Sequence, residues 1–159
     1  MSPMVTSAQR TYLEVTEAAG RDFVQRGLQG PVVMLNLLKY RQVADYSAHP
    51  ELAPSTPVSG EAAYGVYMEH TLPLLQKSGG SILFWGRGAP FLIGPTEEAW
   101  DAMLLVKQAS VESFLAFASD PAYLAGVGHR IAALEDSRLL PLTEEAVPGM
   151  VPALDPGGA

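Results

Sequence analysis

The chain has 159 residues, of which 48% are hydrophobic and 17% charged, a composition typical of one folded domain with a sizeable core. It contains no cysteine, which excludes disulfides, thiolate metal sites and thiol nucleophiles. The net charge of −7 repels phosphate backbones, and the ten Lys and Arg residues are scattered, so we expect no nucleic-acid partner. Neither a signal peptide nor a run of about 18 apolar residues is evident, so we expect a cytoplasmic protein without a membrane partner.

The N-terminal residues predict a helix over 7–26 that opens with a capping box at Thr6–Gln9. Apolar residues recur there at helical spacing, namely Ala8, Tyr12, Val15, Ala19 and Phe23. We interpret residues 1–29 as a helical extension of the domain that follows.

An apolar segment near residues 32–39 predicts the first strand, with the polar Asn36 in its middle and Arg41 just beyond it. A strand this apolar is typical of one that is covered on both faces, so a lone amide in it needs a partner or a function. Residues 42–59 then form a long loop with several prolines, which indicates either a functional lid or disorder.

The rest of the chain predicts a regular alternation of helices and strands. In order, we expect a helix near 61–77 capped by Ser59 and kinked at Pro73, a strand from Ser81 that is bulged or bent before Phe91-Leu92-Ile93, a strand near 99–107, a helix over 111–118, a helix from Asp120-Pro121 to about Leu134, and a strand over 137–142. Without the first helix, this order is the βαββαβ arrangement of an α+β, ferredoxin-like domain with an antiparallel sheet. Residues 143–159 are rich in Pro and Gly and are expected to be a flexible tail.

A ferredoxin-like sheet carries helices on one face only, and the strands expected near 32–39 and 99–107 are apolar on both sides. The uncovered face therefore needs another cover. Pairing with the sheet of a second copy is the simplest solution, so we expect a homodimer.

Several segments also carry a family resemblance. They are Pro31–Arg41, Ala63-Tyr64 with Tyr67, Leu74-Leu75 before Gly79-Gly80, Trp100–Val106, Ser113–Leu115, Asp120–Tyr123, His129-Arg130 and Leu134–Leu139. Together, over residues 30–142, they resemble a widespread bacterial domain-of-unknown-function family of the dimeric α+β barrel superfamily, which also holds small antibiotic-biosynthesis monooxygenases and EthD-like proteins. The resemblance implies the barrel fold and a homodimer but no particular reaction, because the superfamily hosts many chemistries.

Three side chains are the candidate catalytic groups: His70, Tyr67 and Arg87. Arg87 follows a glycine-broken strand and could bind a carboxylate or enolate, with Arg41 as a second clamp. Tyr67 and His70 are three residues apart on one helix, where they could share a hydrogen bond or flank a substrate, and a histidine can act as a general base. The alternatives are a structural ion pair for Arg87, simple packing for Tyr67 and a solvated His70.

Asn36, Arg41, Tyr64 and Trp85 are the candidate substrate-binding residues. Asn36 could orient a ligand carbonyl, or its amide could instead bond to nearby backbone. The histidines lack the spacing of metal ligands, so we expect no metal site and no cofactor.

Two functions fit these observations. The first is a small cofactor-independent enzyme, monooxygenase- or isomerase-like, for an apolar metabolite with a carbonyl or phenol group. Its pocket would lie between the sheet and the helices, with residues 42–59 as a lid. The second is a non-catalytic dimeric module for binding or assembly, with an interior filled by side chains.

Overall fold

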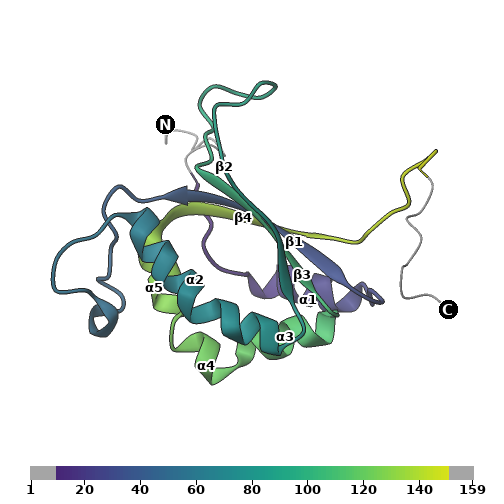
Figure 1. Cartoon of the computed structure of the whole chain (residues 1–159), viewed down its shortest axis with the longest axis horizontal. Helices are drawn as coiled ribbons and strands as arrows, with labels where there is room; N and C mark the ends of the chain where they lie inside the picture. Colours follow the sequence, from purple (N-terminus) through teal and green to yellow (C-terminus); the bar gives the residue numbers. More distant parts are fainter. Residues whose placement is uncertain (1–9, 151–159) are drawn as a thin grey trace, which may run out of the picture.

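The computed structural model describes residues 10–150, which form one antiparallel sheet and a layer of helices (Figure 1). The strands are β1 (Val32–Tyr40), β2 (Ser81–Arg87), β3 (Ala102–Gln108) and β4 (Leu134–Leu142), in the order β2-β3-β1-β4. The helices are α1 (Glu17–Gln25), α2 (Gly60–Lys77), α3 (Val111–Ser119), α4 (Pro121–Leu124) and α5 (Val127–Ala133), with a 3-10 turn, η2, at Pro50–Leu52. Apart from α1, the order is the predicted βαββαβ, so the α+β ferredoxin-like fold is confirmed.

The two faces of the sheet differ in how they are covered. Along β1, Val32 and Leu38 are fully buried beneath the helices, whereas Leu35 and Leu37 on the opposite side remain partly exposed. The strand register adds residues from the neighbouring strands to that opposite side. We call the resulting surface the open face; the same register places Lys107 and Arg138 on it, and its apolar residues are Val33, Leu35, Leu37, Phe84, Met103, Leu105, Leu140 and Leu142. No helix within residues 10–150 covers it (Figure 1).

Helix α2 packs closely on the covered side of the sheet. Ser59 caps it as predicted, with its Oγ accepting a hydrogen bond from the Ala62 N–H at 3.0 Å. The first residue, Gly60, approaches the backbone so closely that a Cβ would lie 2.3 Å from the Arg41 carbonyl oxygen and 2.4 Å from that of Ala133. This contact joins the N-terminus of α2 to the end of β1 and the end of α5.

The predicted helix over 7–26 is wrong in its first part. Residues 1–9, including the predicted capping box, lie outside the described residues, and α1 begins only at Glu17, capped by Thr16. The segment before it is not helical and is held by hydrogen bonds to distant residues. Tyr12 N–H donates to Asp136 Oδ1 at 2.8 Å, Ser137 Oγ donates to the Tyr12 carbonyl at 2.6 Å, and Arg130 Nη1 donates to the Leu13 carbonyl at 2.6 Å. These bonds take the backbone groups that a helix would use.

Two predictions in the second half also need correction. Strand β2 is irregular as predicted, but its register shifts between Ile82 and Phe84 and not at the later glycines. The strand ends at Arg87, so Phe91-Leu92-Ile93 is not part of it. The predicted helix from Pro121 to about Leu134 is broken at Gly126, and Leu134 already belongs to β4. Gly126 separates the two helices, and the ring of His70 occupies the space that a side chain at this position would need.

The C-terminal residues add no further helix or strand to the described part of the chain. Residues 143–150 form neither helix nor strand, and residues 151–159 lie outside the described part. Within residues 10–150, no helix combines the length and apolarity that crossing a membrane requires.

Candidate functional site

A small hollow opens where β1 and β2 end and where α2 and β3 begin. Its volume is about 220 Å³. We call it the Arg87 hollow; it is lined by Tyr40, Glu61, Trp85, Gly86, Arg87, Asp101 and Ala102. An engineered protein cavity of about 150 Å³ accommodates benzene, so the Arg87 hollow suits a molecule with a single ring.

Charged groups occupy one side of the Arg87 hollow. Arg87 Nη2 donates to Glu61 Oε1 at 2.5 Å, and this hydrogen bond and charge raise the pKa of Arg87. The Arg87 side chain is 73% exposed, so its remaining N–H groups can bind a further acceptor. Asp101 Oδ2 accepts the Tyr40 backbone N–H at 2.8 Å, which fixes this carboxylate at the start of β3.

The Tyr40 phenol provides a neutral donor in the same hollow. Burial, followed by the charges of Glu61 and Asp101, raises its pKa to about 12. At neutral pH the hydroxyl therefore keeps its proton and can donate to a ligand oxygen.

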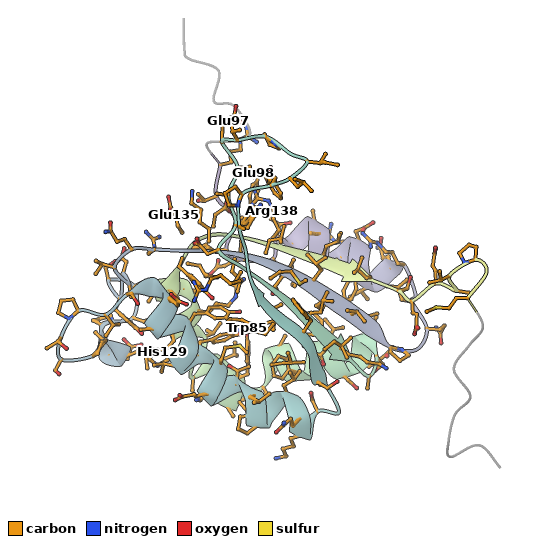
Figure 2. The ribbon with its side chains drawn as sticks, turned by 45° about the horizontal axis from the view of Figure 1, so that its top comes forward. Trp85, Glu97, Glu98, His129, Glu135 and Arg138 are labelled. Atoms are coloured by element: carbon orange, nitrogen blue, oxygen red, sulfur yellow. The ribbon has the colours of Figure 1, made fainter. Side chains whose placement is uncertain are left out.

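Aromatic rings form the other side of the Arg87 hollow. Trp85 lies on β2 (Figure 2) and is 47% exposed. Its ring stacks on that of buried Tyr64 of α2, with a centroid distance of 5.8 Å and an interplanar angle of 12°. The ring centroids of Tyr64 and Tyr67 are 5.2 Å apart. Tyr67 Oη and Tyr123 Oη form a hydrogen bond of 2.9 Å. Burial raises the pKa of Tyr64 and Tyr67, so both phenols stay uncharged at neutral pH.

Asn36 lies on the same face of the sheet as Trp85, with Leu104 of β3 between them. At the usual strand spacing their backbones are about 10 Å apart. The Asn36 amide donates to the carbonyls of Met34 and Leu104 at 3.3 and 3.4 Å. Of the two roles considered for Asn36, these bonds match the one in which its amide bonds nearby backbone. Asn36 does not line the Arg87 hollow.

His70 and Arg41 are not brought to the Arg87 hollow. His70 Nε2 bonds the Ala122 carbonyl oxygen at 2.7 Å, and the ring packs on Gly126, so this histidine joins α2 to the α4–α5 junction. Tyr67 and His70 do not share the hydrogen bond considered for them, because each side chain bonds another partner. Arg41 Nε is buried and finds no hydrogen-bond partner among the described residues.

The loop of residues 42–59 covers a different hollow from the one that we predicted. It lies over α2 and α5, where it leaves a cavity of about 270 Å³ without any residue from the sheet. We call this the loop hollow; it is lined by Tyr46, Leu52, Pro54, Val58, Ala62, Val66 and His129. The loop is held in place by backbone hydrogen bonds from Ala44 to Val58 and from Asp45 to Ala132.

Tyr46 and His129 are the polar pair of the loop hollow. Tyr46 Oη lies 2.7 Å from His129 Nδ1. Burial, with a smaller contribution from His70, lowers the pKa of His129, and burial raises that of Tyr46. Both groups are therefore neutral at pH 7.

The three histidines of the chain gather around α5 but take separate partners. His49 packs on Gly128, His70 bonds Ala122, and His129 faces Tyr46. Within the described part of the chain, no group of three His, Asp or Glu side chains could hold a metal ion.

Sequence reasoning missed three polar residues of the Arg87 hollow, namely Tyr40, Glu61 and Asp101. Each stands at or beside the end of an element: Tyr40 closes β1, Glu61 is the second residue of α2 and Asp101 precedes β3. The ends of neighbouring strands meet at one edge of a sheet, so polar residues at predicted strand ends were the available signal.

Comparison with known proteins finds similar structures. No protein-family model matches the chain, and no curated protein does. The structure of the methylated RPA0582 protein is 32% identical in sequence, covers 88% of this chain and 98% of its own, and has a TM-score of 0.77. A second structure of RPA0582, described as a protein of unknown function from Rhodopseudomonas palustris, is 31% identical, with coverages of 87% and 100% and a TM-score of 0.78.

A more distant structure is described as a dimeric protein of unknown function with a ferredoxin-like fold, from Bacteroides fragilis. It is 17% identical, covers 72% of this chain and 96% of its own, and has a TM-score of 0.43. The bacterial domain-of-unknown-function family that the sequence resembles stays a prediction. At 32% identity over nearly the whole length of RPA0582, the chain belongs to the family of that Rhodopseudomonas palustris protein.

Proposed function

We propose that the protein is a homodimer that binds a small, planar, apolar metabolite with a carbonyl or phenol oxygen in the Arg87 hollow. The observation that carries this proposal is that an exposed guanidinium and an exposed indole line the same 220 Å³ space. Arg87 would bind the ligand oxygen, and Trp85, backed by Tyr64, would stack on the ring.

The charges in the hollow narrow the ligand class. Glu61 and Asp101 place two negative charges beside the single positive charge of Arg87, so an anionic ligand would be repelled by more charge than attracts it. A neutral carbonyl or phenol oxygen fits better. The Tyr40 hydroxyl, protonated because its pKa is about 12, would donate a second hydrogen bond to that oxygen.

An isomerase-like reaction is the enzymatic form of this proposal. Glu61 would take a proton from the carbon beside the ligand carbonyl, while Arg87 and Tyr40 stabilise the enolate oxygen that forms. The same carboxyl group would return the proton to another carbon of the enolate, so that atoms and charge balance. In this form Glu61 takes the role that the sequence suggested for His70 or Tyr67.

Ligand binding is tested with 4-hydroxybenzaldehyde, which carries both a phenol and a carbonyl group on one ring. Saturation-transfer NMR should detect binding to the wild-type protein, and Arg87→Ala and Trp85→Ala should each weaken it by about tenfold. Arg21→Ala is the matched control, because Arg21 forms an equally exposed ion pair with Glu17 on α1. Equal binding by wild type and Arg87→Ala would remove the hollow from the proposal.

The dimer is supported by the open face, whose apolar side chains would otherwise stay in water. Sedimentation at micromolar concentration should give the mass of two chains, and Leu35→Asp should give that of one. Val24→Asp is the control, because Val24 is exposed on α1, away from the open face. A wild-type protein that sediments as a monomer contradicts this part of the proposal.

The second candidate function is the non-catalytic binding or assembly module, and the size of the hollows favours it. Cavities of 220 and 270 Å³ lie below the range of about 300–1,000 Å³ that is typical of ligand pockets. Under this candidate, the dimer forms as above and 4-hydroxybenzaldehyde does not bind. Location in the cytoplasm is part of both proposals.

A further inference from the structure

The connection between β2 and β3 is an arm that ends in an apolar tip. We define the arm as residues 88–99 and the tip as Phe91, Leu92 and Ile93. Leu92 is 100% exposed and Ile93 93% exposed, while Phe91 is 44% exposed. Single exposed apolar residues are common on proteins, but adjacent, fully exposed Leu and Ile side chains at the end of a projection indicate a contact site.

The arm is built firmly at both ends. At its base, Gly88 N–H donates to the Asp101 carbonyl at 2.7 Å, and Trp100 Nε1 donates to Glu98 Oε1 at 3.0 Å. At its tip, the Phe91 ring packs so closely on Gly94 that a Cβ there would lie 2.7 Å from the ring. The Phe91 ring thus orders the turn at the tip, while Leu92 and Ile93 point outward. An ordered tip loses less conformational entropy on binding.

The direction of the arm favours a second copy of this chain as its partner. The arm extends beyond the ends of β2 and β3 and projects away from the helix layer (Figure 1). The open face, on the side of the sheet away from the helices, includes Phe84 of β2 and Met103 of β3, the strands from which the arm springs. A copy that covers the open face therefore lies beside the arm.

Charge makes a lipid surface the poorer partner. Glu97 and Glu98 lie on the same arm as the tip (Figure 2), and the chain carries a net charge of −7. Anionic membranes attract basic segments and repel acidic ones. The apolar tip is thus carried on an acidic arm, which suits a protein contact better than an anionic bilayer.

We propose that the arm is a clasp that binds the second copy in the dimer, with Leu92 and Ile93 buried against that copy. This inference rests on the proposed homodimer. Because a two-fold dimer uses each surface twice, both arms contribute, and each reaches past the edge of its own sheet to contact the other chain. The open face would supply most of the interface, and the arms would close its ends.

The test measures dimer dissociation with the arm changed and the open face intact. Leu92→Ser/Ile93→Ser should raise the dimer dissociation constant on the order of 100-fold or more in a sedimentation dilution series, since each dimer would bury both tips. Val43→Ser is the matched control, an exposed valine on the 42–59 loop that should leave the constant unchanged. Fully exposed positions carry no packing in the monomer, so the double variant should fold like the wild type.

A second measurement uses the absence of cysteine from the chain. Ile93→Cys should react slowly with a maleimide when the protein is concentrated, and fast when it is diluted below its dissociation constant. Adding Leu35→Asp, which removes the open-face contact, should restore fast reaction at every concentration. Val43→Cys should react at one rate throughout.

The outcomes separate the clasp from the dimer itself. A wild-type dimer whose dissociation constant is unaffected by the double substitution overturns the clasp and leaves the dimer standing. A wild-type monomer at 100 µM overturns both. Flotation with phosphatidylcholine–phosphatidylglycerol vesicles that depends on Leu92 and Ile93, without a change in the dissociation constant, assigns the tip to lipid and also overturns the clasp.

Discussion

The two faces of the sheet have similar sequences but different surroundings. On β1, Leu38 is fully buried on the helix-covered side and Leu35 remains partly exposed, although both are leucines only three positions apart in one strand. The helix-covered side holds the core, with Tyr64, Tyr67 and Ala133 packed around Leu38. The open face is apolar without a cover, so apolarity in this sheet indicates two different contacts, one within the chain and one that we propose between chains.

The largest effect expected from this comparison is on stability. Leu38→Ala should lower the free energy of unfolding by about 2–5 kcal/mol, because it leaves a cavity in a packed core. Leu35→Ala should cost less in the monomer, and its cost should grow with protein concentration because binding of a second copy stabilises the folded state. Urea unfolding at two protein concentrations measures both. Equal, concentration-independent costs would mean that the open face behaves as core.

A smaller effect tests how closely the helix layer approaches the sheet. Gly60→Ala should cost about 1–3 kcal/mol, because its Cβ would meet the backbone carbonyls of Arg41 and Ala133 and α2 would have to shift. Gly65 stands in the same helix with no atom within 4 Å of the position of a Cβ. Gly65→Ala should therefore stabilise the protein by about 0.5–1 kcal/mol through helix propensity alone. If Gly60→Ala is as harmless as Gly65→Ala in thermal unfolding, the close contact does not exist in solution.

The covered side also separates what local sequence could predict from what it could not. Ser59 and Asp120 act as N-caps as predicted, because a cap depends on residues only two or three positions apart. The alternation along β1 likewise predicted two apolar faces. By contrast, residues 10–16 are not helical, and the partners that hold them, Asp136, Ser137 and Arg130, are more than a hundred positions away in the chain.

The Arg87 hollow also combines features that local sequence could predict with features that depend on contacts between distant residues. Trp85 and Tyr64 were predicted as site residues from their own positions in a strand and a helix, and their rings stack on one another. That Glu61 pairs with Arg87 depends on where α2 starts relative to the end of β2, which no local pattern encodes. The failure of the Tyr67–His70 pair has the same origin, because the α4 segment supplies a nearer partner to each side chain.

The smallest effect concerns the outer side of the helix layer, where the loop hollow lies. Burial lowers the pKa of His129 from its ordinary value of 6.5, so below pH 6.5 the unfolded chain binds a proton that the folded chain resists. Stability from the neutral His129 is therefore fully present above pH 6.5 and is lost as pH falls below it. His129→Gln should flatten the dependence of stability on pH below 6.5, measured by urea unfolding at several pH values.

Tyr46→Phe is the control that separates burial from hydrogen bonding at His129. The Tyr46 hydroxyl can donate to neutral Nδ1 or accept from the protonated ring, so its loss should lower stability by roughly 0.5–1.5 kcal/mol across the whole range. The slope below pH 6.5 should remain, because burial is the main cause of the lowered pKa. If Tyr46→Phe flattens the profile and His129→Gln does not, the imidazole is not the titrating group. In that case the loop of residues 42–59 would bury His129 less, and it would pack on the helix layer less closely than the covered face of the sheet does.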